Sequence, residues 1–114
     1  MSKSILTTTK EMLGIQPDAT YFDSQLIVCI NSAFSVLNQL GVGPKDGFYI
    51  EDDTKTWDDY TTDVNMNMLQ MYIAVKTRLL WDPPTSSTLL EALKQEVAEY
   101  EFRMNVHCDG KEET

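Results

Sequence analysis

The chain has 114 residues, of which 42% are hydrophobic and 24% charged, and this balance excludes an intrinsically disordered chain. The length suits a single core, so we expect residues 1–114 to form one domain. Eighteen acidic residues against nine basic ones give a net charge of −9, which repels phosphate backbones and argues against a nucleic-acid-binding surface.

Targeting and membrane signals are missing from the sequence. No stretch approaches the ~18–20 apolar residues of a membrane span, and MSKSILTTTKEML lacks the apolar run of a secretory signal. We therefore expect synthesis in the cytosol and no membrane partner. Cys29 and Cys108 are isolated thiols that provide neither a disulfide framework nor a paired metal motif.

Two helices are predicted in the first third of the chain. Residues 4–13 form a short helix that Gly14 ends in a left-handed turn. A second helix is capped by Asp23 or Ser24 and ends at 41–44, where two glycines and a proline interrupt helical geometry. One stripe of this second helix is apolar: Leu26, Ile30, Ala33, Leu37 and Leu40.

Helical periodicity is absent from residues 45–60, KDGFYIEDDTKTWDDY, where acidic residues alternate with aromatic ones. The pattern predicts a loop or a short hairpin, with a polar turn at 51–54 and Trp57 anchoring the far side. A long connection inside a small domain is often functional. We therefore expect a contact surface here, formed by Phe48, Tyr49, Ile50, Glu51, Asp52, Asp53 and Trp57.

Two long helices complete the chain. The third begins at Thr61 or Thr62 and ends near Trp81, because Asp82-Pro83-Pro84 cannot continue it. Its expected core stripe is Val64, Met68, Met71, Tyr72, Val75 and Leu79. The fourth helix follows the hydroxyl-rich segment 85–88 and extends to Val106, and a flexible polar tail occupies 107–114. The expected fold is all-α, a small bundle of about four helices with an extended C-terminal helix.

One edge of the last helix is apolar, because its apolar residues recur at steps of three and four: Leu90, Leu93, Val97, Tyr100 and Met104. Such a helix either packs on its own domain or binds another chain, and periodicity alone does not choose between the two.

Catalytic and metal-binding motifs are not visible. The aspartates of 52–63 lack the alternation, central glycine and closing glutamate of a calcium loop, and His107 beside Cys108 is too little for zinc. There is no glycine-rich phosphate loop, nucleophile elbow or histidine-containing triad. We predict a protein that is not an enzyme and uses no cofactor or metal.

Four segments occur in a characteristic order: MLGI (12–15), INSAFSVLNQLGVGP (30–44), FYIEDDTKTWDDY (48–60) and LLWDPPTSSTLLEALKQEVAEYEFRMNV (79–106). In this order the chain resembles, over nearly its whole length, the head-tail connector or adaptor proteins of long-tailed bacteriophages. The LGVGP, IEDDTKTW and DPPTSS phrases are the most specific parts. They mark turns and helix ends rather than catalytic groups.

The resemblance implies a virion protein that is present in the host cytoplasm before assembly. Its subunits would form a ring, expected to be a dodecamer, that docks under the portal and leads to a downstream neck, stopper or tail-completion protein. In such adaptors the C-terminal helix tends to engage the portal, which assigns that contact to the edge from Leu90 to Met104. The loop over 47–60 would face a neighbouring subunit or the neck protein, and duplex DNA would pass through the channel without specific binding.

Two other functions are compatible with parts of the sequence. A generic helical interaction protein could use its last helix to bind an unrelated partner groove. A small acidic inhibitor could mimic DNA, but its carboxylates would then form a continuous face, whereas here they concentrate in the loop, the last helix and the tail.

Overall fold

Four α-helices and one short 3-10 helix form the fold of residues 4–16, 18–60 and 64–112, which the computed structural model describes. In chain order they are α1 (Ile5–Met12), α2 (Asp23–Gln39), η1 (Trp57–Asp59, the 3-10 helix), α3 (Met66–Trp81) and α4 (Ser87–Glu112). No strand occurs among the described residues, and a long loop joins α2 to α3. The predicted all-α fold of four helices is confirmed.

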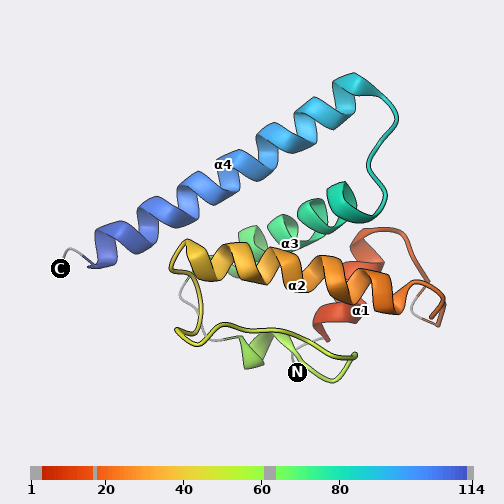
Figure 1. The fold of residues 1–114 in the computed structure, drawn as a ribbon, viewed down its shortest axis with the longest axis horizontal. Helices are drawn as coiled ribbons and strands as arrows, with labels where there is room; N and C mark the ends of the chain where they lie inside the picture. The colour runs from red at the N-terminus through yellow and green to blue at the C-terminus, as the bar shows by residue number, and fades with distance from the viewer. Residues whose placement is uncertain (1–3, 17, 61–63, 113–114) are drawn as a thin grey trace.

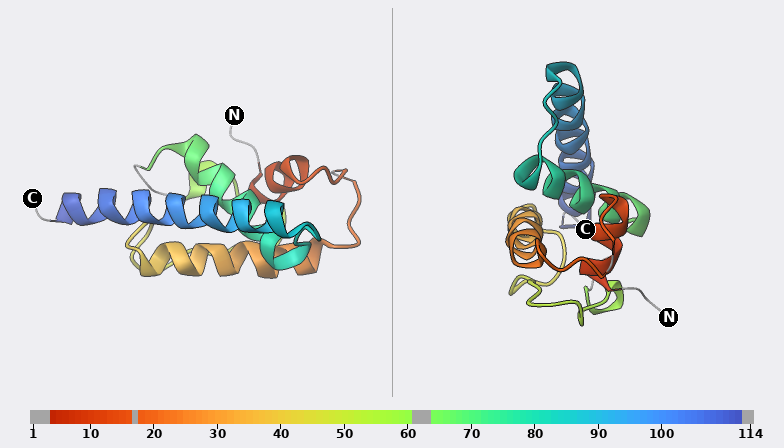
Figure 2. Two further views of the ribbon diagram at one scale, coloured as in Figure 1. Left: turned by 90° about the horizontal axis from the view of Figure 1, so that it is seen from above. Right: turned by 90° about the vertical axis from the view of Figure 1, so that its right-hand side faces the viewer.

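The helix α3 lies at the centre of the molecule. It packs against α1 and α2 on one side and against α4 on the other, as the end-on view of Figure 2 shows. Segment 82–86, which contains Pro83 and Pro84, leads from the end of α3 to the distant start of α4 (Figure 1). The last helix is therefore held mainly by α3.

The apolar stripe of α2 is largely as expected. Leu26, Ile30, Ala33 and Leu37 are buried, and only Leu40 at the helix end is partly exposed. These side chains meet α3 and the long loop in one core, so burial of apolar area is the main stabilising term of the fold.

The predicted stripe of α3 is only partly right. Tyr72 is fully buried, but Met71 is 43% exposed and the deepest aliphatic positions are Leu69 and Ile73. The difference arises because α3 is covered on two sides, by α1 and α2 and by α4, so its buried arc is wider than a single stripe.

The ends of α1 agree with the expectation, whereas the start of α2 does not. Ser4 caps α1 by accepting a hydrogen bond from Thr7 N–H at 3.2 Å, and Gly14 follows the helix in the left-handed region, at φ 79°. The N-cap of α2 is Phe22, which makes no side-chain cap. The predicted cap at Asp23 or Ser24 is therefore wrong, because Asp23 lies inside the first turn and pairs with Lys10.

Two further boundaries differ from the expectation. The proposed start of the third helix at Thr61 or Thr62 lies outside the described residues, and α3 begins at Met66 with Asn65 as its cap. The α4 backbone continues to Glu112, through most of the segment expected to be a tail. The short hairpin is not formed, since the described part of the loop has one isolated bridge, from Thr56 to Ser4, and no strand.

Candidate functional site

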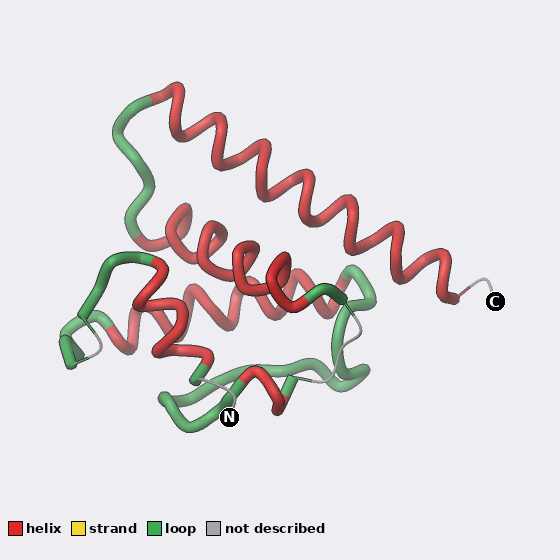
Figure 3. The backbone as a smooth tube through the Cα atoms, turned by 180° about the vertical axis from the view of Figure 1, so that it is seen from behind, coloured by secondary structure: helices red, strands yellow, loops and turns green. Residues whose placement is uncertain are grey.

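The loop over residues 47–60, which we call the contact loop, is tied to two helices. The Asn31 side chain on α2 bonds both the N–H and the carbonyl of Ile50, and the Ile5 N–H at the start of α1 donates to the Lys55 carbonyl at 2.9 Å. Figure 3 shows the loop running along one side of the helices, drawn in green. It is therefore a positioned surface despite having no regular strand.

Aromatic rings anchor the contact loop from beneath. Phe34 of α2, Phe48 and Tyr60 form a triad with ring centroids 5.0–5.1 Å apart. The Tyr60 hydroxyl donates to the Val42 carbonyl at 3.2 Å, beside Gly43. Aromatic pairs at such separations add to the stability from buried area, so the triad holds both ends of the loop against α2.

The predicted loop residues divide into two groups. Ile50 and Trp57 lie in the core and Phe48 is half-buried, so these three determine the shape of the loop. The exposed residues, which can reach a partner, are Tyr49, Glu51, Asp52 and Asp53. Sequence alternation could not separate the buried anchors from the exposed positions, and the role of the loop as a contact surface stays a prediction.

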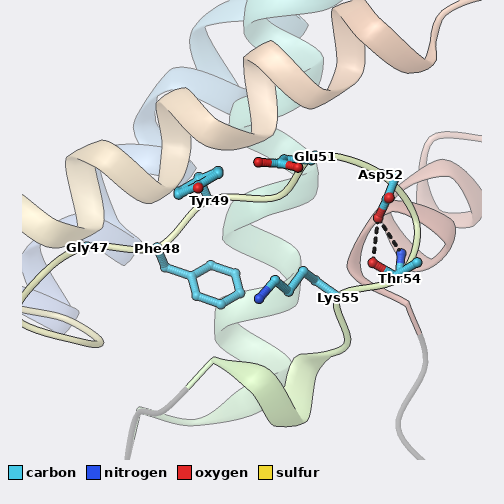
Figure 4. Close-up of a pocket in the computed structure, with 7 residues that line it drawn as sticks. All are labelled: Gly47, Phe48, Tyr49, Glu51, Asp52, Thr54 and Lys55. Carbon is cyan, nitrogen blue, oxygen red and sulfur yellow. Dashed lines mark hydrogen bonds between the residues drawn. The ribbon is translucent and has the colours of Figure 1, made fainter.

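A cavity of about 390 Å³ opens on the exposed side of the contact loop (Figure 4). Phe48 and Lys55 point toward one another there, with the Lys55 ammonium 6.0 Å from the ring centroid. Asp52 closes a turn by accepting hydrogen bonds from the hydroxyl and the N–H of Thr54, and these bonds hold the pKa of Asp52 below its usual range. The cavity wall combines two aromatic residues with two carboxylates and one ammonium group.

The apolar edge of α4 faces its own domain. Val97 and Met104 are buried against the core, whereas Leu90, Leu93 and Tyr100 remain partly exposed. Of the two alternatives for this edge, packing on its own domain is therefore the one that the structure has. A partner that touched Val97 or Met104 would have to displace α4 from α3.

Polar bonds reinforce the contact between α3 and α4. The Tyr72 hydroxyl donates to Glu101 at 2.8 Å, and Lys76 lies 3.7 Å from the same carboxylate. Burial first, and then the Glu101 carboxylate, raise the pKa of Tyr72 far above its usual value. Burial and a hydrogen bond to Glu96 likewise raise the pKa of Tyr100.

The opposite side of α4 carries an apolar strip that the predicted edge from Leu90 to Met104 does not include. Ala98, Phe102 and Val106 follow one another at steps of four residues, so they share a helix face. Phe102 is 66% exposed and Val106 50% exposed. We call these three residues the outward face. The spacing of Phe102 and Val106 was the available signal.

The described residues hold no group of histidine, cysteine and carboxylate side chains arranged to bind a metal ion. None of the helices in the described ranges combines the length and hydropathy that crossing a membrane requires. Burial raises the pKa of the Cys29 thiol, which is not in a disulfide.

The family of the chain follows from a comparison with known protein families. The model of the phage connector protein family matches residues 5–111, from the start of α1 nearly to the end of α4. The chain belongs to the phage connector protein family. The resemblance inferred from the LGVGP, IEDDTKTW and DPPTSS phrases is thus confirmed.

The contact loop and α4 of this connector both lie inside the matched region, and membership implies partners in the phage head or tail. No curated protein and no solved structure matches the chain significantly.

Proposed function

We propose that this phage connector is a structural subunit of a ring, a dodecamer in the virion, that docks under the portal and links the capsid to the neck or tail. The family match over residues 5–111 is the observation that carries the proposal. The protein is then not an enzyme and needs no cofactor, and its place is the head-tail interface after assembly from the host cytoplasm.

The portal contact is assigned to α4. Of its apolar edge, Leu90, Leu93 and Tyr100 are partly exposed in the folded subunit and can meet the portal without any rearrangement. Val97 and Met104 join that contact only if α4 leaves α3. The partly exposed residues at the N-terminal half of α4 are therefore the first positions to test.

The contact loop is assigned to a neighbouring subunit or to the downstream neck, stopper or tail-completion protein. Tyr49, Glu51, Asp52 and Asp53 supply its exposed groups, and Asn31 and the aromatic triad hold them in place. A preorganised loop loses little entropy on binding, which favours a contact surface.

Net charge supports passage of DNA through the ring. A subunit with a charge of −9 multiplies into a strongly negative assembly, so a channel lined by unpaired carboxylates repels duplex DNA and does not retain it. Retention of duplex DNA by the purified ring at physiological salt would contradict this part of the proposal.

The test is to measure particle mass by light scattering for the protein alone and after mixing with the portal protein of the same phage, followed by negative-stain imaging. We expect a ring, or stoichiometric addition to the portal. The L93E variant should lose portal binding and keep its helical circular dichroism, whereas Q95E, two positions along α4 on its exposed side, should bind normally. A stable monomer that ignores the portal would instead favour a generic interaction protein.

A further inference from the structure

A second exposed surface, outside the contact loop and α4, lies at one end of the molecule. Its residues come from the end of α1, the turn before α2 and the end of α3, and we call it the aromatic end: Met12, Tyr21, Phe22, Arg78, Leu80 and Trp81. Tyr21 is 86% exposed, and Met12, Phe22 and Leu80 are each between 43% and 51% exposed.

Ring contacts and a shared cavity join most residues of the aromatic end. Phe22 packs edge-to-face on Trp81 with centroids 5.2 Å apart and on Tyr21 at 6.5 Å, and the Trp81 indole N–H donates to Gln25 at 3.3 Å. Trp81 also lines a cavity of about 210 Å³ together with Met12 and Arg78. The Trp81 ring at this cavity is therefore held in place by Phe22 and Gln25 before any partner arrives.

The composition of this surface is that of a protein interface. Aromatic residues, methionine and arginine are enriched at interface centres, where lysine and acidic residues are depleted. Carboxylates are present at its margin, since Asp82 lines the cavity with Arg78 and Glu11 adjoins Met12. The patch is apolar and contains a cation without an ion pair, so a partner that brings an apolar side chain and a carboxylate fits it.

The outward face of α4 has that chemistry. Phe102 and Val106 form an apolar ridge of the kind that docks into grooves, and Glu99 lies one turn before Phe102. Glu99 pairs with Arg103 at 2.9 Å, but both side chains are exposed, so this pair is weak enough for Glu99 to change partner. The described part of α4 up to Val106 has four glutamates against two basic residues, so the ridge is set in an acidic helix.

Arg78 is the cation of the aromatic end. Lys10, Lys76, Lys94 and Arg103 each form an ion pair with a carboxylate of the same chain. Arg78, like Lys45 and Lys55, forms none with any of the described residues, and of these three cations only Arg78 belongs to the aromatic end, where Asp82 lines the same cavity. A carboxylate supplied from outside would complete this site.

The two surfaces lie at opposite ends of the subunit. In Figure 1 the C-terminal half of α4 is at the left, whereas the start of α2 and the end of α3 are at the right. A chain therefore cannot cover its own aromatic end with its outward face. A contact between two different surfaces is head-to-tail, and such contacts close into rings when the rotation allows it.

We propose that the aromatic end is the socket for the outward face of α4 from a second copy of this chain, with Phe102 seated beside Met12 and Trp81 and Glu99 facing Arg78. The inference rests on the proposed ring and names its subunit contact. It leaves Leu90 free for the portal, whereas Leu93 borders the socket, because it lines a second cavity together with Met12 and Arg78.

Self-association is measured by sedimentation velocity, both for the protein alone and bound to the portal ring. F102S and R78E should each weaken association by at least tenfold, and E99K should restore it when combined with R78E. Val28 on α2 is 65% exposed and belongs to neither surface, so V28S is the matched control and should associate normally. Circular dichroism checks that every variant is folded.

Mixing variants tests the head-to-tail geometry. F102S keeps an intact socket and R78E keeps an intact outward face, so an equimolar mixture should form one-to-one pairs and nothing larger. Association of F102S and R78E at the wild-type level, or loss of portal binding without any loss of self-association, would overturn the inference. In the second case the portal covers the aromatic end, and the connector function stands. A monomer that also ignores the portal would overturn both proposals.

Discussion

The side chain of Asn31 and the backbone of Ile50 form a pair of hydrogen bonds that fastens the contact loop to α2. The Ile50 N–H donates to Asn31 Oδ1 at 2.8 Å, and Asn31 Nδ2 donates to the Ile50 carbonyl at 2.9 Å. An asparagine amide has one acceptor and one donor side, so it satisfies both backbone groups as a neighbouring strand would. This explains how a buried loop residue is tolerated without a sheet.

Replacing Asn31 by alanine should release the contact loop. The variant leaves the N–H and the carbonyl of Ile50 without partners in a largely dry site, which we expect to cost about 2–3 kcal/mol of unfolding free energy. Urea denaturation measures this loss, and hydrogen exchange should show a faster Ile50 amide. Ser32→Ala is the control, because its hydroxyl bonds only the Val28 carbonyl on an exposed surface. An unchanged exchange rate of the Ile50 amide would show that Asn31 does not hold the contact loop on α2.

Gly43 and Gly14 form a matched pair for a test of the aromatic triad. Both have φ near +80°, so an alanine at either position is strained by about 1–2 kcal/mol. A Cβ at Gly43 would also lie 2.3 Å from the Tyr60 hydroxyl, whereas one at Gly14 meets nothing within 4 Å. Thermal unfolding should therefore show a clearly larger loss for G43A than for G14A. Equal losses would mean that Tyr60 moves aside without cost.

The Tyr72–Glu101 bond makes part of the stability pH-dependent. The raised pKa of Tyr72 in the folded state means that the neutral phenol is favoured, so its contribution is complete below the unfolded pKa of about 10 and is lost as the pH rises above it. Wild type should exceed Y72F by about 1–2 kcal/mol at pH 7.

Above pH 10 the difference in unfolding free energy between wild type and Y72F should shrink by up to about 1 kcal/mol per pH unit. This is less than the full ~1.36 kcal/mol per unit, because solvent at the partly exposed Glu101 weakens the interaction. Urea denaturation of both proteins at pH 7, 10 and 11 gives this difference, and ionisation of the remaining lysines and tyrosines cancels between them. A difference that stays constant up to pH 11 would contradict the assignment.

Local signals in the sequence were sufficient for most of the fold. The stripe from Leu26 to Leu37 and the breaks at Gly14 and 82–84 depend on residues close in the chain, and the structure bears them out. The depth of Leu69 and the pairing of Asn31 with Ile50 depend on packing between elements, which periodicity does not contain.

For the candidate surfaces, too, the sequence indicates local patterns, whereas burial depends on packing between elements. Residues 48–57 were predicted to be a contact segment from composition, yet only the structure separates exposed Tyr49 from buried Ile50. The edge of α4 was visible as a stripe, but its burial depends on where α3 lies. The aromatic end brings together Met12, Phe22 and Trp81, which are far apart in sequence, so no sequence window could reveal it.

Lys10 links the stability of the fold to the geometry of the aromatic end. Its side chain is only 3% exposed, and its ammonium donates to the Ala19 carbonyl at 2.7 Å and to Asp23 at 2.9 Å, on either side of Tyr21 and Phe22.

K10M should cost about 2–4 kcal/mol of unfolding free energy, because it leaves Asp23 without its cation and Ala19 without its donor. K94M removes an exposed pair and should cost about 0.5 kcal/mol or less. Urea denaturation measures both losses of unfolding free energy. At temperatures where K10M is still folded, sedimentation velocity should show that its self-association is weakened, whereas that of K94M is unchanged. A K10M protein as stable as wild type would show that the turn before α2 does not depend on this lysine.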